Sequence, residues 1–572
     1  MNPATTTTSA QAHKPIDSAP PVGKYTAYED RFDVDLPDRT WPGRRLTNAP
    51  QWCSVDLRDG NQSIPTPMSV EQKVAFFKEL VAVGFKEIEI GYPAASLAER
   101  QFTRKLIEEN LIPHDVTPQV LIAAREDLIK DTFACIKGIP RVIIHIYTPT
   151  SIAQREQVFK MSKEEVLESA VKATKVVRQL ADASGIEVKF QFSPESFTGT
   201  EKEFSRDICN AVVDAWNPAP GETVIINLPS TVEHSMPNKY ADLIEWMHRS
   251  FARRENVTLS IHPHNDRGTA TAAAELALLA GADRVEGTLF GNGERAGNLD
   301  LVNLALNMFG QGIDPKLSFK NLPHVREVYE KSVGLRVPER HPYGGDLSVV
   351  AFSGTHQSAI RKGIEHRKKM KIAAWDIPYI PVDFKDFGRS YTPIMVNAQS
   401  GKNGAAFVLD SEFGCRMPTQ MEAPFAKVVQ AWCDKHGIVM PSQKLWEVFE
   451  ANFVKPQGPI TLNAYTTTHV GDQVKAYLEL TVNGKRDIIV HALGNGPIDA
   501  ATKALRDIGQ NVTVKSFAEH SRGEGSDAEA VAYLQVERDG ASTFGVGIDS
   551  NTERASIQAL IAGVNRLAAA QV

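Results

Sequence analysis

Ser260-Ile261-His262-Pro263-His264-Asn265-Asp266 ends an apolar run, Val257 to Ile261, with two histidines at positions i and i+2. Residues two apart in a β-strand point to the same side, so both imidazoles face one way. Two imidazoles on one side can bind a single divalent metal ion. A lone His-x-His also occurs as a structural pair, so a metal site needs further ligands beside it.

Eight short apolar runs alternate with longer amphipathic stretches between about residue 50 and residue 290. Several runs are nearly continuous in Val, Ile and Leu, as is typical of strands buried on both faces. Eight β-α units of this length predict a (β/α)8 barrel, and the alternative is a doubly wound open sheet. The runs are Gln51–Asp59, Phe85–Tyr92, Thr117–Arg125, Arg141–Thr148, Glu187–Ser193, Thr223–Leu228, Val257–His264 and Arg284–Phe290.

Polar residues gather where these predicted strands end, which is where barrels carry their chemistry. In a closed barrel, strands seven, eight and one are neighbours, so Asp59, His262, His264 and Asn298 can meet. In an open sheet they generally could not, so the metal site and the closed barrel support each other. The polar ends are Arg58-Asp59-Gly60-Asn61-Gln62, Arg125, His145, Ser193-Pro194-Glu195, Thr231 and Gly291-Asn292-Gly293-Glu294-Arg295-Ala296-Gly297-Asn298.

The predicted ligands combine hard oxygens with imidazoles, which suits Mg²⁺, Mn²⁺ or Zn²⁺. The set holds no thiolate, which argues against a closed structural zinc site. Strand alternation points Arg58 away from Asp59, but the strand ends there. Arg58 is then either a rim salt bridge or a group that stabilises an anionic oxygen. Glu195 and Glu294 can orient a base or a histidine.

Composition and the pattern of apolar residues divide the chain into four regions. Residues 1–50 form an N-terminal extension that starts as a polar, Pro-rich tail without a signal core. Residues 51–315 form the barrel, and residues 316–457 form a mainly helical connector. Residues 458–572 repeat a strand-strand-strand-helix pattern and predict an α+β binding or regulatory domain with pseudo-twofold symmetry.

Composition places the chain among soluble globular proteins. It has 572 residues, and its net charge of −6 argues against a nucleic-acid surface. Its apolar runs stay far below the roughly 20 residues that span a membrane. Five scattered cysteines without a CxxC pair favour free thiols and a cytoplasmic location.

Three motifs carry a resemblance: Leu57-Arg58-Asp59-Gly60-Asn61-Gln62, His262-Pro263-His264-Asn265-Asp266 and Gly291 to Asn298. Together they resemble the superfamily of 2-isopropylmalate synthases and homocitrate synthases. These enzymes condense acetyl-CoA with an α-keto acid on a metal-bearing barrel. Glu339-Arg340-His341-Pro342-Tyr343-Gly344-Gly345-Asp346 and Gly494-Asn495-Gly496-Pro497-Ile498-Asp499 resemble the long form of 2-isopropylmalate synthase in particular.

The resemblance implies a role for each group of site residues. It implies a divalent metal, K⁺ as an activator, a homodimer, and acetyl-CoA and 3-methyl-2-oxobutanoate as substrates. Catalytic residues of the connector reach the barrel of the dimer partner in this family. The implied metal ligands are Asp59, His262, His264 and Asn298; the keto-acid contacts are Arg58, His145, Ser193 and Thr231; the catalytic helpers are Glu195, Glu294, His356 and Tyr379.

The C-terminal repeat is expected to bind the family's end-product inhibitor, leucine. Glycines at the predicted strand-to-helix junctions would let backbone approach a ligand closely. The alternative is that they form tight turns in a dimer domain. The implied regulatory residues are Gly494, Gly496, Pro497, Gly545 and Gly547.

Other functions stay open on the sequence. Homocitrate or citramalate synthesis would differ only in the keto acid. Retro-aldol cleavage by a hydroxymethylglutaryl-CoA lyase shares an Arg-Asp-Gly start and a His-x-His, but the Gly291 to Asn298 loop and the long C-terminal extension speak against it. A catalytically inactive protein that only senses an amino acid would not need all four predicted metal ligands, and their presence argues against it.

Overall fold

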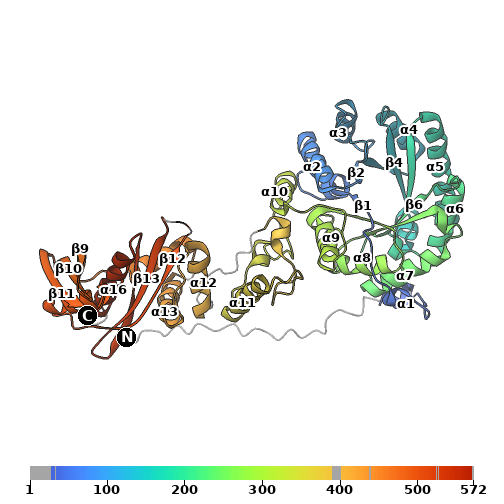
Figure 1. The fold of residues 1–572 in the computed structure, drawn as a ribbon. Coiled ribbons are helices and arrows are strands. Elements are labelled where there is room, and N and C mark those ends of the chain that lie inside the picture. The colour runs from blue at the N-terminus through green and yellow to red at the C-terminus, as the bar shows by residue number, and fades with distance from the viewer. Residues whose placement is uncertain are drawn as a thin grey trace, which may run out of the picture. The chain divides into compact units, whose positions relative to one another are not determined.

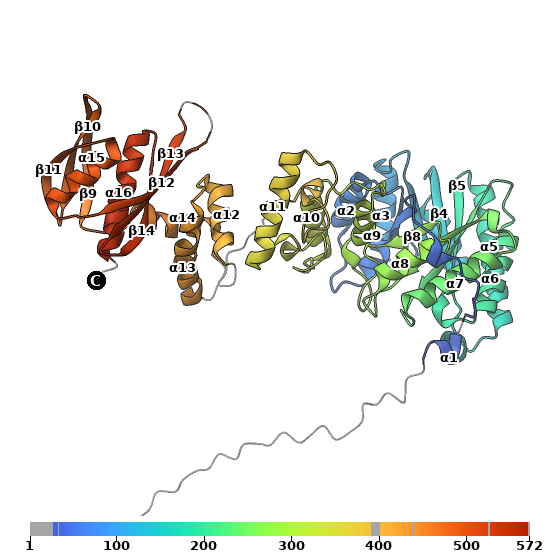
Figure 2. The same ribbon diagram turned by 60° about the horizontal axis from the view of Figure 1, so that its bottom comes forward.

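The structure is a computed structural model that describes residues 27–569 except 33, 390–400, 437–439, 524 and 526. The chain forms two compact units, Met1–Gly345 and Asp346–Val572 (Figures 1 and 2). The helix α1 (Glu29–Phe32) precedes the first unit's barrel.

The first unit is a closed barrel of eight parallel strands in sequence order, β1 to β8. Strand β8 pairs with both β7 and β1, which closes the barrel and confirms the predicted fold. The strands are β1 (Gln51–Ser54), β2 (Glu87–Gly91), β3 (Thr117–Ala123), β4 (Arg141–Pro149), β5 (Glu187–Glu195), β6 (Val224–Ser230), β7 (Val257–Pro263) and β8 (Arg284–Gly287).

Helices surround the barrel strands (Figure 1). Ser69 and Ser162 begin two of them with capping boxes that satisfy the first free amides. Gly84 and Gly185 end the same two helices in the left-handed conformation, where a glycine is least strained. The helices are α2 (Val70–Val83), α3 (Leu97–Glu108), α4 (Glu126–Cys135), α5 (Lys163–Ser184), α6 (Lys202–Trp216), α7 (Pro237–Ser250), α8 (Ala270–Leu279), α9 (Leu301–Gly310) and α10 (Leu322–Val333).

The first predicted strand is shorter than expected. It ends at Ser54, and Asp56–Gly60 form a single π-helical turn. The Asp56 carboxylate fixes this turn: Ser54 Oγ donates to it over 2.8 Å and the Leu289 amide over 3.1 Å. In a helical turn, consecutive residues are not forced to opposite faces, so strand alternation does not apply to Arg58 and Asp59, and both line one pocket.

Part of the predicted N-terminal extension is bound to the barrel. Thr40 and Trp41 donate their amides to Glu245 of α7 over 3.0 and 3.1 Å. Arg39 Nε and Trp41 Nε1 both donate to Asp242 Oδ1 of the same helix. The expected Pro-rich tail, residues 1–26, lies outside the described residues.

The second unit begins with helices, as predicted for the connector. Their bounds are α11 (Gly354–Met370), α12 (Gly401–Phe413), α13 (Thr419–His436) and α14 (Ser442–Phe449). A core that includes Leu409, Phe425, Phe449 and Phe453 packs the last three of these helices together with residues of β13 and β14.

The C-terminal part contains two three-stranded antiparallel sheets, ordered β11-β10-β9 and β12-β13-β14. One helix follows each sheet, which confirms the predicted strand-strand-strand-helix repeat. Figure 2 shows α15 and α16 against the sheets. The elements are β9 (Ile460–Val470), β10 (Gln473–Val482), β11 (Lys485–Gly494), α15 (Pro497–Ala504), β12 (Thr513–Arg522), β13 (Glu529–Arg538), β14 (Ala541–Asp549) and α16 (Thr552–Ala569).

Two of the predicted junction glycines lie inside a strand instead. Gly545 and Gly547 belong to β14, where an added Cβ would lie 2.1 Å from the Ala559 carbonyl oxygen and 1.9 Å from that of Ala555, respectively. These glycines therefore allow α16 to contact the sheet with its backbone.

The two remaining expectations concern membranes and cysteines. Within the described ranges, no helix is long and apolar enough to cross a bilayer. The five cysteines are buried, and none forms a disulfide, as predicted.

Candidate functional site

Three ligand-bearing side chains meet at the seam between β7, β8 and the turn after β1. Asp59, His262 and His264 each offer one ligand atom, and these atoms lie within 4.8 Å of one another. The Nε2 atoms of both histidines are 3.6 Å from Asp59 Oδ2. Asn298 joins them, because its Nδ2 donates to Asp59 Oδ2 over 2.8 Å and its Oδ1 lies 2.9 Å from His262 Nε2.

Local backbone structure brings Asn298 into this cluster. His264 and Asn298 form an isolated antiparallel bridge, which ties the end of β7 to the loop after β8. Glycines fold the loop tightly: a Cβ on Gly293 would lie 2.2 Å from Asn298 Nδ2, and Gly297 has a φ of +107°. These glycines therefore allow the loop to place the Asn298 amide beside Asp59 and His262.

A pocket of about 340 Å³ opens beside the cluster. Nine of the predicted site residues line it: Arg58, Asp59, His145, Ser193, Glu195, Thr231, His262, His264 and Glu294. The lining also includes residues to which the sequence assigned no role, namely Gln62, Tyr92, Leu121, Tyr147, Asn227, Pro229 and Arg295. Asn298 is fully buried behind the pocket wall.

Arg58 is held at the pocket by two carboxylates. Its Nη1 lies 2.5 Å from Asp59 Oδ1, and its Nε donates to Glu89 Oε1. These contacts give Arg58 the ion pairs that one interpretation expected at the barrel rim, but the partners Asp59 and Glu89 are both buried. The guanidinium also has further N–H groups available to an anionic ligand.

His145 and Ser193 form a chain beside Arg58. His145 Nδ1 lies 2.8 Å from Glu89 Oε2, and its Nε2 lies 2.7 Å from Ser193 Oγ. Thr231 sits one strand further along, where its Oγ1 accepts the Ser196 amide over 3.0 Å. These polar groups line the wall of the pocket next to the metal-ligand cluster.

A buried network beneath the pocket was missed by the sequence analysis. The Glu286 carboxylate accepts hydrogen bonds from Gln119, Gln191 and Asn227 and contacts His262 Nδ1 at 2.8 Å. Arg284 donates to the same carboxylate over 2.8 Å. The available signal was a polar residue within each otherwise apolar strand, because such a residue must face the barrel interior and find partners there.

The electrostatics of the two histidines differ. Burial lowers the pKa of His262, but the nearby carboxylates of Asp59 and Glu286 outweigh it and raise that pKa to about 10. Burial and the neighbouring charge of His262 lower the pKa of His264 to about 4. Binding of a divalent ion by both imidazoles is therefore expected to release a proton from His262.

Burial also raises the pKa of Glu195, despite a hydrogen bond with Gln154 and the charge of Arg58. A carboxyl group with a raised pKa beside a pocket is a candidate for proton transfer. The Glu294 side chain comes from the loop after β8 and lines the same pocket.

The other predicted catalytic residues lie in the second unit. The rings of His356 and Tyr379 stack with a centroid distance of 3.9 Å. Tyr379 is 63% exposed and has a φ of +66°, which is uncommon for a bulky residue. Their role at a barrel stays a prediction of the resemblance.

The predicted regulatory residues belong to β11, to the start of α15 and to β14. An added Cβ on Gly494, the last residue of β11, would lie 2.3 Å from the Ala500 amide nitrogen. A Cβ on Gly496 would meet nothing within 4 Å. Gly496 therefore faces open space at the start of α15, next to Pro497.

Family models match three successive parts of the chain. Residues 49–328 match the HMGL-like family, residues 346–410 an alpha-isopropylmalate synthase post-catalytic domain-like family, and residues 440–568 a LeuA allosteric (dimerisation) domain. The boundaries predicted after residues 50, 315 and 457 stay predictions.

Several relatives match nearly the whole chain, and each is named 2-isopropylmalate synthase. The protein of Corynebacterium efficiens is 45% identical over 567 residues, covering 96% of this chain and 97% of the relative. That of Clostridium acetobutylicum is 46% identical, covering 95% and 99%. That of Ralstonia nicotianae is 47% identical, covering 95% of each.

The sequence matches these relatives over nearly its whole length. The matched region includes the barrel with its Asp-His-His-Asn cluster and the two domains that follow it. The chain therefore belongs to the 2-isopropylmalate synthase family.

Proposed function

We propose that the chain condenses acetyl-CoA with 3-methyl-2-oxobutanoate and hydrolyses the thioester, giving 2-isopropylmalate and CoA. The observation that carries this proposal is the meeting of Asp59, His262, His264 and Asn298 at a pocket that also holds Arg58. The names of the relatives, which cover nearly the whole chain, support the same reaction.

The donor set fits a divalent metal ion. Two imidazoles, a carboxylate and an amide oxygen suit Mg²⁺, Mn²⁺ or Zn²⁺, and the pocket leaves room for a substrate beside them. A bound ion would act as a Lewis acid toward the keto oxygen of the substrate. Asp59, His262, His264 and Asn298 would hold it, and Glu286 would orient His262.

The pocket wall supplies both polar and apolar contacts for a branched keto acid. Arg58 offers N–H groups to an anionic oxygen, and His145, Ser193 and Thr231 offer polar contacts. Leu121, Tyr147 and Pro229 supply apolar surface in the same pocket. We assign that surface to the isopropyl group, since burial of each methyl or methylene group contributes about 0.8 kcal/mol.

His356 is our candidate for the base. It takes a proton from the acetyl methyl group, and the resulting carbanion forms a C–C bond with the keto carbon of the second substrate. Arg58 then stabilises the alkoxide that develops on the former keto oxygen. Water attacks the thioester carbonyl, the C–S bond breaks, and CoA leaves as a thiol.

The assignment of the base rests on the resemblance and on the titration range of imidazole. Glu195 or Glu294 orients the base at the barrel, and Tyr379 stacks on His356. In the homodimer that we propose, His356 and Tyr379 serve the partner subunit's barrel. Mixed dimers of His356→Ala and Glu195→Ala subunits would regain activity if the two residues come from different subunits.

Leucine is our proposed effector. The match of residues 440–568 to a LeuA allosteric (dimerisation) domain supports a regulatory site there. Gly496 and Pro497 leave the start of α15 open, where backbone amides attract a carboxylate. Leucine would act by binding one enzyme state better than another, and K⁺ is the proposed activator.

A keto-acid panel tests the reaction. CoA release would be followed with 3-methyl-2-oxobutanoate, 2-oxoglutarate and pyruvate, after chelation and metal add-back, with and without leucine. The proposal expects the highest kcat/KM with 3-methyl-2-oxobutanoate and loss of activity on chelation. A preference for 2-oxoglutarate or pyruvate would instead identify a homocitrate or citramalate synthase, and no CoA release would favour a sensor.

A further inference from the structure

We propose that a basic pocket at the end of α11 binds the adenosine 3′,5′-bisphosphate end of acetyl-CoA. The pocket measures about 460 Å³ and lies wholly within the second unit, between α11 and residues 372–385. The inference rests on the proposed function, because it takes acetyl-CoA as the substrate. It concerns the part of that substrate farthest from the reacting carbon.

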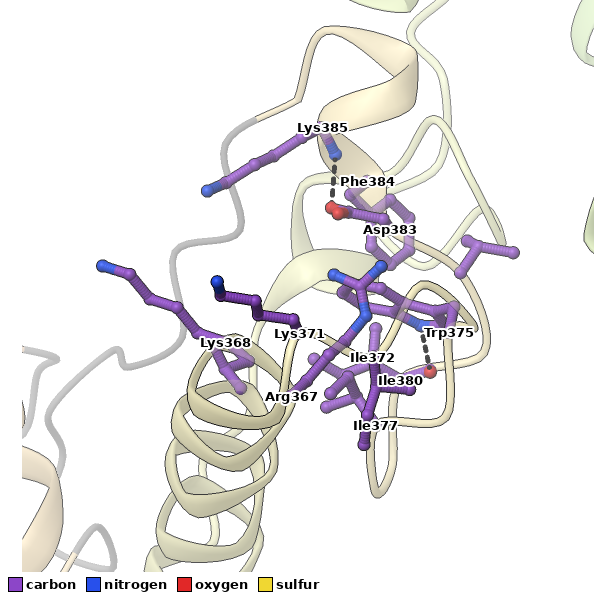
Figure 3. A pocket seen from close by; sticks show the side chains of 12 residues that line it. Arg367, Lys368, Lys371, Ile372, Trp375, Ile377, Ile380, Asp383, Phe384 and Lys385 are labelled. Atoms are coloured by element: carbon purple, nitrogen blue, oxygen red, sulfur yellow. Dashed lines mark hydrogen bonds between the residues drawn. The ribbon is translucent and has the colours of Figure 1, made fainter.

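The charge of the pocket selects an anion. Four cationic side chains line it, namely Arg367, Lys368, Lys371 and Lys385, against the single carboxylate of Asp383. Asp383 already accepts the Lys385 amide over 3.1 Å. In the part of the chain that the structure describes, the ammonium groups of Lys368, Lys371 and Lys385 have no ion-pair partner. Figure 3 shows these lysines on one side of the pocket.

The pocket also offers apolar surface for a ring. Trp375 and Phe384 line it together with aliphatic residues such as Ile377 and Ile380 (Figure 3). Adenine is a flat ring that stacks on aromatic side chains, and its ribose phosphates are anionic. A nucleotide of this kind can contact both the aromatic and the cationic side chains of the pocket, whereas inorganic phosphate would contact only the cations.

Two of the lining side chains are fixed before any ligand binds. Arg367 donates from Nε to the Ala374 carbonyl over 2.9 Å and from Nη2 to the Ala373 carbonyl over 2.7 Å. Its guanidinium lies 5.2 Å from the centre of the Trp375 ring, and Trp375 Nε1 donates to the Ile380 carbonyl over 3.0 Å. Such preorganisation lowers the entropy lost on binding.

The end of a helix repels anions weakly through its carbonyl groups, so this location needs an explanation. The Ile372 amide donates to the Arg367 carbonyl over 3.1 Å, and the Lys371 amide to the Lys368 carbonyl over 3.3 Å. These bonds occupy carbonyls of the last turn. The four cations then dominate the local field.

The pocket and the proposed base belong to the same surface of the second unit. His356 and Arg367 are eleven residues apart on α11, which places them on one face of the helix, about 16 Å apart along its axis. Residues 372–382 follow that face: Tyr379 stacks on His356, and Trp375 contacts Arg367. The separation suits an extended pantetheine arm, with the acetyl group at His356 and the nucleotide in the pocket.

Steady-state kinetics of the full-length enzyme test the proposal. The double variant Lys368→Gln/Lys371→Gln should raise KM for acetyl-CoA about fivefold to tenfold, as the loss of two partly exposed charge pairs implies. The rise should shrink with acetyl-dephospho-CoA, which lacks the 3′-phosphate, and vanish with acetyl-pantetheine. The matched control Lys362→Gln/Lys369→Gln removes two charges from the same helix outside the pocket and should leave KM unchanged.

Direct binding separates failure of this inference from failure of the proposed function. Adenosine 3′,5′-bisphosphate would be titrated into the full chain and both double variants by calorimetry, whether or not CoA release is seen. Weaker binding to Lys368→Gln/Lys371→Gln alone supports the pocket. Equal binding to all three proteins, no binding at all, or equal KM values in an active enzyme would overturn it. Tighter binding of ATP than of the bisphosphate would also overturn the assignment to CoA.

Discussion

The barrel mouth and the C-terminal sheets each contain a Gly-Asn-Gly sequence, and the two do different work. At Gly291-Asn292-Gly293, the last glycine makes room for the Asn298 amide, which an added Cβ would approach to 2.2 Å. At Gly494-Asn495-Gly496, the first glycine makes room for the backbone of α15, and the last faces open space. One tripeptide places a ligand side chain and the other packs a helix on a sheet.

The same tripeptide therefore has two roles, and the contacts of each glycine indicate the role better than the motif does. A substitution in the barrel loop should damage activity, and one in the C-terminal strand should damage stability. The following predictions test that division in order of decreasing effect.

Loss of a metal ligand should have the largest effect. His264→Ala removes one of the three clustered ligands, and we expect turnover to fall at least about a hundredfold, since a Lewis acid contributes several kcal/mol. Steady-state CoA release and metal content would be measured together. Wild-type activity that survives a strong chelator would refute this.

Loss of the buried carboxylate behind His262 should cost less. Glu286→Gln keeps the shape but places an amide where five groups donate to or contact a carboxylate, so we expect metal affinity or turnover to fall about tenfold to a hundredfold. Metal titration followed by activity gives the measurement. The exposed Glu126→Gln is the control, and an equal effect in both would contradict the role.

A pair of glycine substitutions addresses the comparison directly. Gly293→Ala displaces the Asn298 amide and should lower kcat about tenfold, because small displacements of a reacting group are costly. Gly494→Ala forces α15 from its sheet and should cost about 1–3 kcal/mol of stability with little effect on kcat. Both kcat and Tm would be measured for each variant. Lower stability with normal kcat in Gly293→Ala, or lower kcat with normal stability in Gly494→Ala, would contradict the assigned roles.

The open glycine at α15 should affect regulation. Gly496→Asp would set a carboxylate against that of leucine, so the half-inhibitory leucine concentration should rise about tenfold, equivalent to 1.4 kcal/mol. Gly43→Asp adds the same charge at another glycine with open space around it. Unchanged inhibition of Gly496→Asp, or inhibition overcome by the keto acid alone, would argue against the site.

The smallest effect on activity is expected at Asp56, where pH acts on stability instead. Burial outweighs the hydrogen bonds from Ser54 and the Leu289 amide and raises the pKa of Asp56 to about 7. Between about pH 4 and pH 7 the folded chain binds this proton and the unfolded chain does not, so Asp56 lowers stability as pH rises through that window. Above pH 7 the penalty is complete.

Asp56→Asn stays neutral throughout. Its Tm relative to wild type should therefore rise by roughly 5–10 °C between pH 5 and pH 8, because the two pH units below a pKa of about 7 correspond to about 2.7 kcal/mol. Thermal melts at the two pH values provide the test, with the exposed Asp214→Asn as control. A constant Tm difference would show that Asp56 does not hold the extra proton.

The sequence predicts the barrel because the alternation of apolar strands with amphipathic helices can be read from neighbouring residues. Closure of the barrel follows from the requirement that Asp59 on the first strand meets the histidines on the seventh. It predicts the repeat of the C-terminal sheets for the same reason. It does not predict the π turn at Asp56–Gly60, because the turn depends on the Leu289 amide, which is distant in sequence. The partners of Glu286 were also missed, since each lies on a different strand and only the polar positions within those strands indicated them.

The glycines of β14 show a further limit. Gly545 and Gly547 resemble turn residues in the sequence, yet their role depends on how closely α16 approaches the strand. Such an approach is a property of the folded domain. The His356–Tyr379 stack likewise joins residues that no local pattern connects.

The π turn after β1 has a mechanical consequence. Arg58 and Asp59 are covalently adjacent and in contact, so any displacement at the seam between β8 and β1 would move them together. A fluctuation that widened this seam would separate Asp59 from both histidines while keeping it paired with Arg58. The Leu289 amide bonded to Asp56 and the Asn292 amide bonded to Gly60 span this joint, so they hold the carboxylate of Asp59 at a fixed distance from the two imidazoles.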